Sequence, residues 1–324
     1  MAVLNMIQAI NRTLRDEMKR DDRIIILGED VGVNGGVFRA TEGLILEFGP
    51  NRVLDTPLAE SGIIGVSIGM ALYGLRPVPE IQFLDFIYPA FDQIESELSK
   101  FRYRSGGQFS VPIVIRTPYG GGIRGSHYHS QSTEAFFAHT PGLKVVIPGT
   151  PYDAKGLLTS ALRDQDPVMF LEPKKIYRTV RGEVPEEEYT VPIGKANVAR
   201  EGDDVVIFAY GAMLHVALET AELASAKGIN VEVVDLRTIL PFDVETIMSS
   251  VKKTGRVVIL HEACKTCGFG AEIAAQIAER GILNLKAPIL RVAGFDVPFP
   301  YALEEDYMPN PSRVLTAVEK LHNF

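Results

Sequence analysis

The chain has only two cysteines in 324 residues, and this scarcity excludes a framework of disulfide bonds. No apolar run approaches the ~18 residues that cross a bilayer, because glycines interrupt the most apolar stretch, 62–75. The first residues show no basic stretch followed by an apolar core, so we expect no secretory signal. These absences favour a protein of the reducing cytoplasm without a membrane segment.

Basic charge is also scarce, since the net charge is −8 and the sequence pI about 5.4. Lysine and arginine are scattered, so neither a nucleic acid nor a membrane surface is an expected partner. The chain lacks a Walker-type Gly-Lys-Ser/Thr motif and the Gly-Asp-Gly motif that carries magnesium and diphosphate in thiamine enzymes, and its one Gly-x-Gly-x-x-Gly spacing, at 120–125, does not open a predicted helix as a dinucleotide fingerprint does. By itself, therefore, the chain shows no phosphate-binding motif.

What is present is the composition of a large globular core, with 46% hydrophobic and 23% charged residues. β-branched runs alternate with helical stripes, which predicts an α/β protein whose mostly parallel sheets are covered by helices. In the first part we expect helices at 3–18, 86–101 and 154–162, and strands at 24–27, 78–83, 112–116, 143–147 and 168–171. In the second part we expect strands at 205–210, 231–235 and 257–261, and helices at 214–226, 244–251 and 271–278.

The texture of the sequence changes between 181 and 204, where acidic residues and prolines appear without helical or alternating period. At 324 residues the chain is long enough for about two domains. We therefore expect a first domain over 1–180, a linker over 181–204 and a second, smaller domain over 205–324. The second domain shows no evident catalytic cluster.

Glu60 is the first candidate for chemistry. It follows Pro57, which favours an extended turn, and it precedes a predicted helix. Carboxylates are common at helix starts because the helix dipole favours them, so position alone gives Glu60 no chemical role. Gly62, Gly65 and Gly69 recur along that helix, however, and each costs about 1 kcal/mol against alanine. Close approach of another backbone would offset this cost, so we expect Glu60 to start a helix at a subunit interface.

His129 is the second candidate, in a loop rich in glycine that also carries His127. Glycine-rich backbone lets a chain approach a ligand closely, although a plain surface loop is the alternative. A zinc site would need two further ligands at ordered spacing, and none is evident. We therefore favour an imidazole positioned for proton transfer.

Cys264 and Cys267 form a lone Cys-x-x-Cys pair. A redox or metal function is possible for such a pair, but a second pair is missing and the segment shows no other chemistry. We expect two small buried thiols instead.

Glu60 and His129, in this order on an α/β scaffold, resemble the acid and the histidine of one enzyme family. The chain is similar, over essentially its whole length, to beta subunits of the thiamine-diphosphate-dependent first component of 2-oxoacid dehydrogenase complexes, which are transketolase-like. The matching segments are Leu27-Gly28-Glu29-Asp30-Val31-Gly32, Gly36-Val37-Phe38 to Gly43-Leu44, Asp55-Thr56-Pro57 to Glu60, Gly74-Leu75-Arg76-Pro77, Tyr103-Arg104-Ser105-Gly106-Gly107, His129-Ser130-Gln131-Ser132, Lys144-Val145-Val146-Ile147-Pro148 and Asp235-Leu236-Arg237-Thr238.

The resemblance implies that Glu60 hydrogen-bonds the aminopyrimidine N1′ of thiamine diphosphate. Such a bond favours the 4′-imino tautomer, which removes the thiazolium C2 proton before the cofactor attacks a 2-oxoacid. The resemblance also implies that Leu58, Gln82 and Phe86 line the aminopyrimidine, and that Glu29 supports the Glu60 network. Glu60 is thus expected to be catalytic, and all five residues to bind the cofactor.

The resemblance further implies partners for this half-site. His129 matches the histidine linked to reductive acylation of the lipoyl group, which a dihydrolipoyl transacylase carries. In the family Mg²⁺ and the diphosphate are held by a separate alpha subunit, the cofactor lies at the alpha–beta interface, and two alpha chains assemble with two beta chains. A structural monovalent cation, usually K⁺, is held in relatives at positions matching Ile113, Ala161, Leu162, Asp164 and Asp166.

The substrate and the enzyme class leave several hypotheses open. The segments 128–132, 134–139 and 170–174 resemble branched-chain 2-oxoacid dehydrogenases more than pyruvate dehydrogenases, so we favour a branched-chain substrate, with a pyruvate or acetoin dehydrogenase beta subunit as the alternative. A part of a transketolase or deoxyxylulose-phosphate synthase is a second enzyme hypothesis, although those chains usually carry their own diphosphate domain. A non-catalytic scaffold of the same fold is a third hypothesis, and the presence of both Glu60 and His129 disfavours it. A stand-alone oxidoreductase is a fourth, which the missing dinucleotide fingerprint disfavours.

Overall fold

The computed structural model describes all residues from Met1 to Phe324 and divides them into two compact units. Unit 1 comprises Met1–Tyr119 and Phe136–Ile193, and unit 2 comprises Gly120–Ala135 and Gly194–Phe324. The segment 120–135 therefore leaves the first unit in sequence and belongs to the second in space. None of the helices combines the length and apolarity needed to cross a membrane.

Unit 1 is built on a parallel sheet in the order β6-β7-β5-β4-β2-β3. Its strands are β2 (Ile24–Gly28), β3 (Val53–Asp55), β4 (Arg76–Glu80), β5 (Val114–Tyr119), β6 (Lys144–Val146) and β7 (Val168–Pro173). Strands β2, β4, β5 and β7 are buried along their whole length, as expected for strands of a parallel sheet that is covered on both faces.

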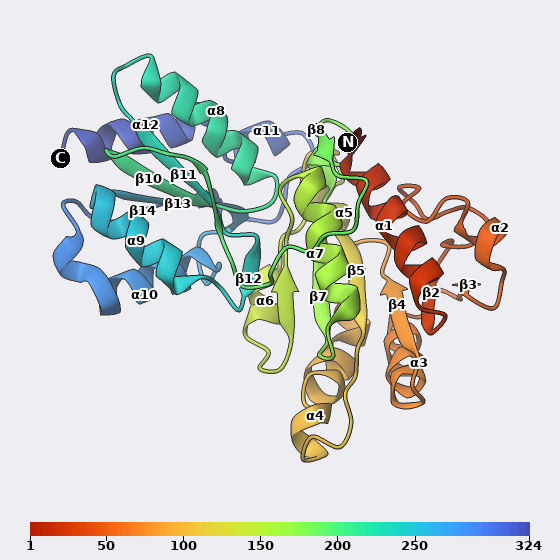
Figure 1. Cartoon of the computed structure of the whole chain (residues 1–324). Helices are drawn as coiled ribbons and strands as arrows, with labels where there is room; N and C mark the ends of the chain where they lie inside the picture. The colour runs from red at the N-terminus through yellow and green to blue at the C-terminus, as the bar shows by residue number, and fades with distance from the viewer. The chain divides into compact units, whose positions relative to one another are not determined.

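The longer helices of unit 1 have clear reasons to begin where they do. Asn5 and Gln8 form a capping box at the start of α1 (Met6–Arg20), and Thr150 caps α7 (Pro151–Arg163) through the Asp153 amide. Helices α1 and α7 pack side by side, as Figure 1 shows. The remaining helices are α2 (Leu44–Phe48), α3 (Glu60–Leu72), α4 (Phe101–Arg104) and the 3₁₀ turn η4 (Lys174–Ile176), while α6 (Glu134–Ala138) spans the boundary between the two units.

Unit 2 has a five-stranded sheet in the order β14-β13-β10-β11-β9, parallel except for β9. Helices α8 and α12 pack on one face, and α9 and α10 on the other (Figure 1). The strands of this sheet are β9 (Asn197–Arg200), β10 (Val205–Ala209), β11 (Val231–Asp235), β13 (Val257–Cys264) and β14 (Leu290–Gly294), and the short strand β12 (Thr238–Leu240) lies outside it. Its helices are α5 (Ser126–His129), α8 (Met213–Ser225), α9 (Val244–Thr254), α10 (Gly270–Gly281), η5 (Ile282–Asn284), α11 (Glu304–Tyr307) and α12 (Pro311–His322). The expected α/β class is confirmed.

The single helix predicted over 86–101 is wrong. The chain instead forms two 3₁₀ turns, η1 (Leu84–Phe86) and η2 (Tyr88–Ala90), followed by a π-helix, η3 (Gln93–Leu98), before α4. Pro89 lies in η2 and has no backbone N–H to continue a regular helix. The apolar spacing of this segment therefore predicted its buried face but not its backbone.

The structure also differs from the expected linker over 181–204. Strand β8 (Arg181–Val184) in this segment pairs antiparallel with β1 (Ala2–Asn5), and β9 pairs with β11. The unit boundary falls between Ile193 and Gly194. These strands are mostly exposed, so their side chains show no apolar alternation that would have revealed them.

Candidate functional site

The carboxyl ends of β2, β3 and β4 meet at one edge of the sheet in unit 1. Gly28 ends β2 and stands in register with Asp55 on β3 and Glu80 on β4. A Cβ on Gly28 would lie 2.5 Å from the Glu80 carbonyl oxygen, so only glycine allows this close approach. Glu29 follows Gly28 directly and therefore lies at the edge where α/β sheets bind ligands.

Glu29 and Glu60 place two carboxyl groups near each other at this edge. Glu60 is the first residue of α3 and is half-buried. Burial raises the pKa of Glu29, and the negative charges of Asp30 and Glu60 raise it further. The Glu29 carboxyl therefore holds a proton more readily than an exposed glutamate does, and in that state it can donate a hydrogen bond.

The other three residues predicted to bind the cofactor, Leu58, Gln82 and Phe86, differ in their exposure and contacts. Leu58 lies in the turn before α3 and is 68% exposed. The Gln82 amide, just beyond β4, donates to Asp30 Oδ2 at 3.4 Å. Phe86 is half-buried, with its ring edge-to-face against Phe83 at a centroid distance of 5.6 Å. The edge thus combines carboxyl groups, an amide and exposed apolar surface.

Asp55 is a residue of this edge that the sequence did not single out. Its carboxylate accepts the backbone N–H groups of Gly32 at 2.6 Å and Val33 at 3.2 Å. A Cβ on Gly32 would lie 2.7 Å from Asp55 Oδ2, so glycine is needed for the contact. Asp55 therefore fixes the loop that follows Glu29. An acidic residue at a strand end, followed by Thr-Pro, was the available signal.

A buried ionic group lies directly beneath the edge and was also missed. The Arg116 guanidinium on β5 bonds Glu80 at 2.8 Å and Glu172 on β7 at 2.7 Å, and all three are nearly inaccessible to solvent. The Tyr177 hydroxyl donates to the second oxygen of Glu172 at 2.5 Å. A charged residue inside an otherwise apolar strand needs a partner, and this was the signal for the group.

In this buried ionic group a single guanidinium, that of Arg116, lies between two carboxyl groups, and this arrangement decides where protons are held. Burial disfavours the charged guanidinium, but Glu172 and Glu80 outweigh burial and raise the pKa of Arg116. Burial also raises the pKa of Glu80, despite the adjacent guanidinium. The group thus keeps Arg116 charged, and a proton is held more tightly at Glu80 than at an exposed glutamate.

His129 lies in unit 2, in the segment 120–135 that contains α5. It ends the single turn of α5, and a Cβ on Gly125 would lie 2.5 Å from the His129 Cβ. The Gly120 N–H donates to the Gln131 carbonyl at 3.1 Å and closes the loop at its base. The range 205–324, in which the sequence showed no evident catalytic cluster, does not include His129, which belongs to unit 2 because the segment 120–135 does. Glu60 and His129 lie in different units.

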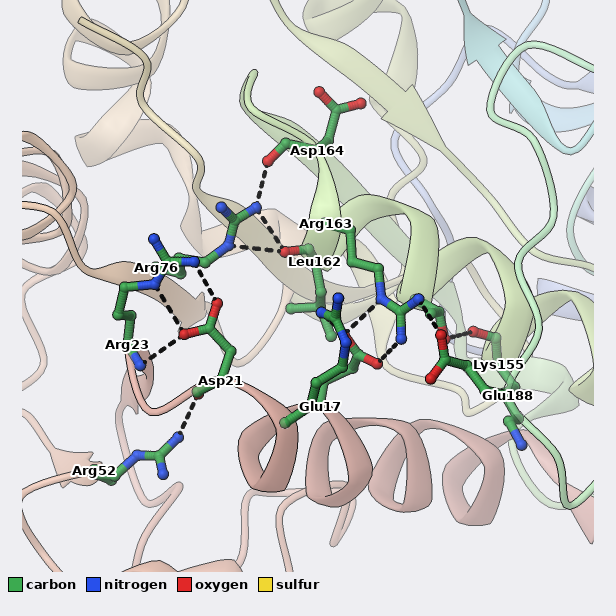
Figure 2. A network of polar contacts seen from close by, with 12 residues as sticks. Glu17, Asp21, Arg23, Arg52, Arg76, Lys155, Leu162, Arg163, Asp164 and Glu188 are labelled. Atoms are coloured by element: carbon green, nitrogen blue, oxygen red, sulfur yellow. Dashed lines mark hydrogen bonds and ion pairs between the residues drawn. The ribbon is translucent and has the colours of Figure 1, made fainter.

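The residues predicted to hold a monovalent cation lie around the end of α7. The Arg76 guanidinium donates to the carbonyl of Leu162 at 3.0 Å and to that of Asp164 at 2.5 Å, as Figure 2 shows. The carbonyls of Ile113 and Ala161 each accept a backbone N–H. The Leu162 carbonyl oxygen accepts two bonds from Arg76, whereas the carbonyl oxygens of Ile113, Ala161 and Asp164 each retain a lone pair of the kind that K⁺ takes.

The acidic side chains of that set pair with bases. Lys144 bonds the Asp164 carboxylate, and Arg102 bonds the Asp166 carboxylate. No group of three or more His, Cys, Asp or Glu side chains is arranged to hold a metal ion. The network in Figure 2 lies where β2 and β4 begin, at the end opposite Glu29, so any cation held here has a structural role.

Two further expectations have different outcomes. Cys264 and Cys267 were expected to be buried, but both are exposed because β13 ends at Cys264 and a surface turn follows. The expectation of buried thiols is therefore wrong.

Along α3, the face that carries Gly62, Gly65 and Gly69 is exposed, and a Cβ on Gly69 would meet no atom within 4 Å. Contacts within the chain do not explain these glycines.

Comparison with known proteins gives two domain families and close full-length relatives. The Transketolase, pyrimidine binding domain matches residues 2–180, and the Transketolase, C-terminal domain matches residues 194–314. The pyruvate dehydrogenase E1 component subunit beta of Bacillus subtilis (strain 168) is 54% identical over 325 residues, and the match covers 100% of both chains. The 2-oxoisovalerate dehydrogenase subunit beta of the same organism is 54% identical over 327 residues, with the same coverage.

A solved structure supports the fold. A split gene transketolase, described as an inactive beta4 tetramer, superposes with a TM-score of 0.82 at 24% identity, covering 99% of this chain and 98% of that chain. At this identity the likeness concerns the fold alone. It agrees with two transketolase-like domains whose mostly parallel sheets are flanked by helices.

Proposed function

Because this chain belongs to the family of beta subunits of the first component of 2-oxoacid dehydrogenases, we propose that it supplies the pyrimidine-binding half of a thiamine diphosphate site. The observation that carries the proposal is the pair of carboxyl groups, Glu29 and Glu60, at the carboxyl edge of the unit 1 sheet. The reaction is the oxidative decarboxylation of a 2-oxoacid with acyl transfer to a lipoyl group.

The residues at this edge fit the aminopyrimidine ring. A flat heteroaromatic ring with a protonated nitrogen needs a carboxylate beside that nitrogen and apolar surface against its faces. Glu60 supplies the carboxylate, the exposed Leu58 supplies apolar surface, and the Gln82 amide lies beside Asp30 at the same edge. When bound, thiamine diphosphate supplies the carbon nucleophile and the electron sink for loss of CO2.

Within this site each residue of the chain has a defined task. Glu60 holds the ring nitrogen in the protonated state through a hydrogen bond, and Glu29, whose pKa is raised by burial, takes up a proton beside Glu60 more readily than an exposed glutamate does. Phe86, packed on Phe83, provides an aromatic wall. We propose that His129 acts afterwards, in the transfer of the acyl group to the lipoyl thiol, where an imidazole can exchange a proton.

The chain's own residues also support a partner. It contains no Gly-Asp-Gly motif for Mg²⁺ and diphosphate, so we propose that an alpha subunit holds both and that two alpha chains assemble with two beta chains. The exposed glycine face of α3 begins beside Glu60 and suits close contact with another backbone. The lipoyl group belongs to a transacylase partner, and we propose the cytoplasm as the compartment.

Two finer points complete the proposal. We propose that K⁺ is held by the oxygens of Ile113, Ala161, Leu162, Asp164 and Asp166, where it stabilises the start of β7. For the substrate we propose a branched-chain 2-oxoacid, because 128–132, 134–139 and 170–174 are more similar to that branch. Pyruvate is the second candidate, since the relatives of each kind are equally identical to this chain.

The test of these roles separates the two half-reactions. In the assembled enzyme, Glu60→Gln removes the acid while keeping the side-chain volume, and we expect decarboxylation with an artificial electron acceptor to fall by at least about 100-fold. His129→Ala should spare that reaction but reduce lipoyl acylation by a similar factor. Full decarboxylation by the Glu60 variant would contradict the assignment of the acid. Equal loss of both reactions in the His129 variant would contradict a role in acyl transfer.

A further inference from the structure

The loop that carries His129 is held by two carboxylates from distant parts of the chain. The Gly121 N–H donates to Glu262 Oε2 at 3.0 Å. The Gly122 N–H donates to Glu304 Oε1, and the Arg124 N–H to Glu304 Oε2, each at 3.0 Å. Glu262 lies near the end of β13 and Glu304 is the first residue of α11, so the loop is anchored to the body of unit 2.

The backbone of the loop is shaped to bind an anion. Positive φ angles occur at Gly120 (81°), Gly122 (97°), Arg124 (55°) and Ser126 (56°), alternating with residues of ordinary conformation. Alternation of this kind turns successive N–H groups toward one side and forms a concave anion-binding nest. In this chain the anion is the Glu304 carboxylate, and both of its oxygens are used.

The loop packs closely against the rest of unit 2 at two glycines. A Cβ on Gly120 would lie 2.6 Å from Glu262 Oε1, and a Cβ on Gly121 would lie 2.7 Å from the Phe299 ring. Glu262 and Glu304 are only 3% and 6% exposed, so water competes little for their oxygens. Hydrogen bonds from N–H groups to a buried carboxylate are stronger than those between neutral groups.

We propose that Glu304, together with Glu262, is a positioning residue for His129. The clamp at Gly121, Gly122 and Arg124 fixes one side of the loop, and the Gly120–Gln131 backbone bond fixes its base. His129 lies between these two points and follows Arg124 by a single turn of helix. This inference rests on the proposed role of His129 in acyl transfer, but the clamp itself rests on the contacts alone.

A neighbouring acidic residue provides the matched control. Glu305, next to Glu304, bonds only the exposed Arg124 side chain, at 3.1 Å, and is itself 86% exposed. An exposed ion pair of this kind contributes little. Glu305→Gln therefore serves as the control for Glu304→Gln, which keeps the side-chain volume but replaces one acceptor oxygen by an N–H donor group.

The experiment uses the assembled enzyme carrying Glu304→Gln, Glu304→Ala or Glu305→Gln. Two readouts are followed: amide hydrogen exchange of 120–125 with tryptic cleavage after Arg124, and the two half-reactions. We expect both Glu304 variants to exchange and be cleaved faster. Their kcat for lipoyl acylation should fall by about 10- to 100-fold, because misplacing a reacting group by about 1 Å has that effect. Decarboxylation with an artificial acceptor and the KM for the 2-oxoacid should change by less than about twofold, and Glu305→Gln should match wild type.

Three results would overturn the proposal. Unchanged exchange and cleavage in both Glu304 variants would show that the carboxylate does not hold the loop. Parallel loss of both half-reactions in Glu304→Gln, with a lower melting temperature, would reduce Glu304 to a general structural residue. Faster exchange and cleavage of the loop in the Glu304 variants, with unchanged lipoyl acylation, would show that Glu304 does not position His129 for acyl transfer. His129→Ala, assayed in parallel, separates the two possible reasons for this last result. If His129 has no role in acyl transfer, His129→Ala will also acylate the lipoyl group at the wild-type rate.

Discussion

At the scale of single residues, the raised pKa of Glu29 makes the stability of the proposed site depend on pH. The folded-state pKa of Glu29 is raised above the ordinary value of 4.5 by burial and by the charges of Asp30 and Glu60. A carboxyl with a raised folded pKa stabilises the fold fully only below the pKa of the unfolded chain, and this stability is lost as pH rises through the folded pKa. The wild-type chain therefore carries a repulsive cluster at pH values above the folded pKa of Glu29.

Replacing Glu29 by glutamine should remove this repulsion. We expect the melting temperatures of wild type and Glu29→Gln to agree near pH 4.5, and that of the variant to become increasingly higher as the pH is raised. Glu42→Gln, at an exposed carboxyl of the same unit, is the control and should follow wild type. Parallel curves for Glu29→Gln and wild type at every pH would show that Glu29 does not form a cluster with Asp30 and Glu60.

At the scale of elements, Arg116 joins three neighbouring strands of the unit 1 sheet beneath the proposed site. Its guanidinium on β5 bonds Glu80 at the end of β4 and Glu172 on β7. A Cβ on Gly28 of β2 would lie 2.5 Å from the Glu80 carbonyl oxygen, so the strand that leads to Glu29 depends on the same packing. Removing one partner of a buried ionic group leaves uncompensated charge and is strongly destabilising.

Arg116→Met should therefore lower the free energy of unfolding by about 3–5 kcal/mol, measured by urea denaturation of the full chain. Arg104→Ala removes the exposed partner of Glu97 and is the control, with no resolvable change expected. A change for Arg116→Met as small as that of the control would mean that the buried group does not support the strand ends. Glu80→Gln should be milder, because burial already favours the protonated carboxyl at that position.

Elements also show what the sequence could predict. The buried β-branched runs, such as 24–27 and 205–210, predicted the core strands because period and composition are local properties. Strands β8 and β9 were missed because exposed strands that pair through their backbones need no apolar alternation. In the site, Glu60 and Glu29 could be found from motifs. The partners of Arg116 and the role of Glu304 could not, because the residues that they bond lie 36 to 182 positions away in the chain.

At the scale of the whole molecule, the chain divides into units that do not follow the sequence boundary. The segment 120–135 belongs to unit 2, although the pyrimidine-binding family matches 2–180 without interruption. The proposed catalytic residues Glu60 and His129 therefore lie in different units. The glycine face of α3 is exposed, and a Cβ on Gly69 would meet no atom of the chain within 4 Å. The exposed glycine face is the feature of this chain that supports the proposed contact with a partner.

The most direct test of a shared active site is to measure 2-oxoacid decarboxylation by the chain with and without an alpha-type subunit of the same organism. Each mixture is assayed with and without thiamine diphosphate and Mg²⁺, on branched-chain 2-oxoacids and on pyruvate. We expect activity only when both chains and the cofactor are present, with the branched-chain substrates preferred. Activity of this chain alone, or none from a well-formed complex with the cofactor, would contradict a site built from two chains.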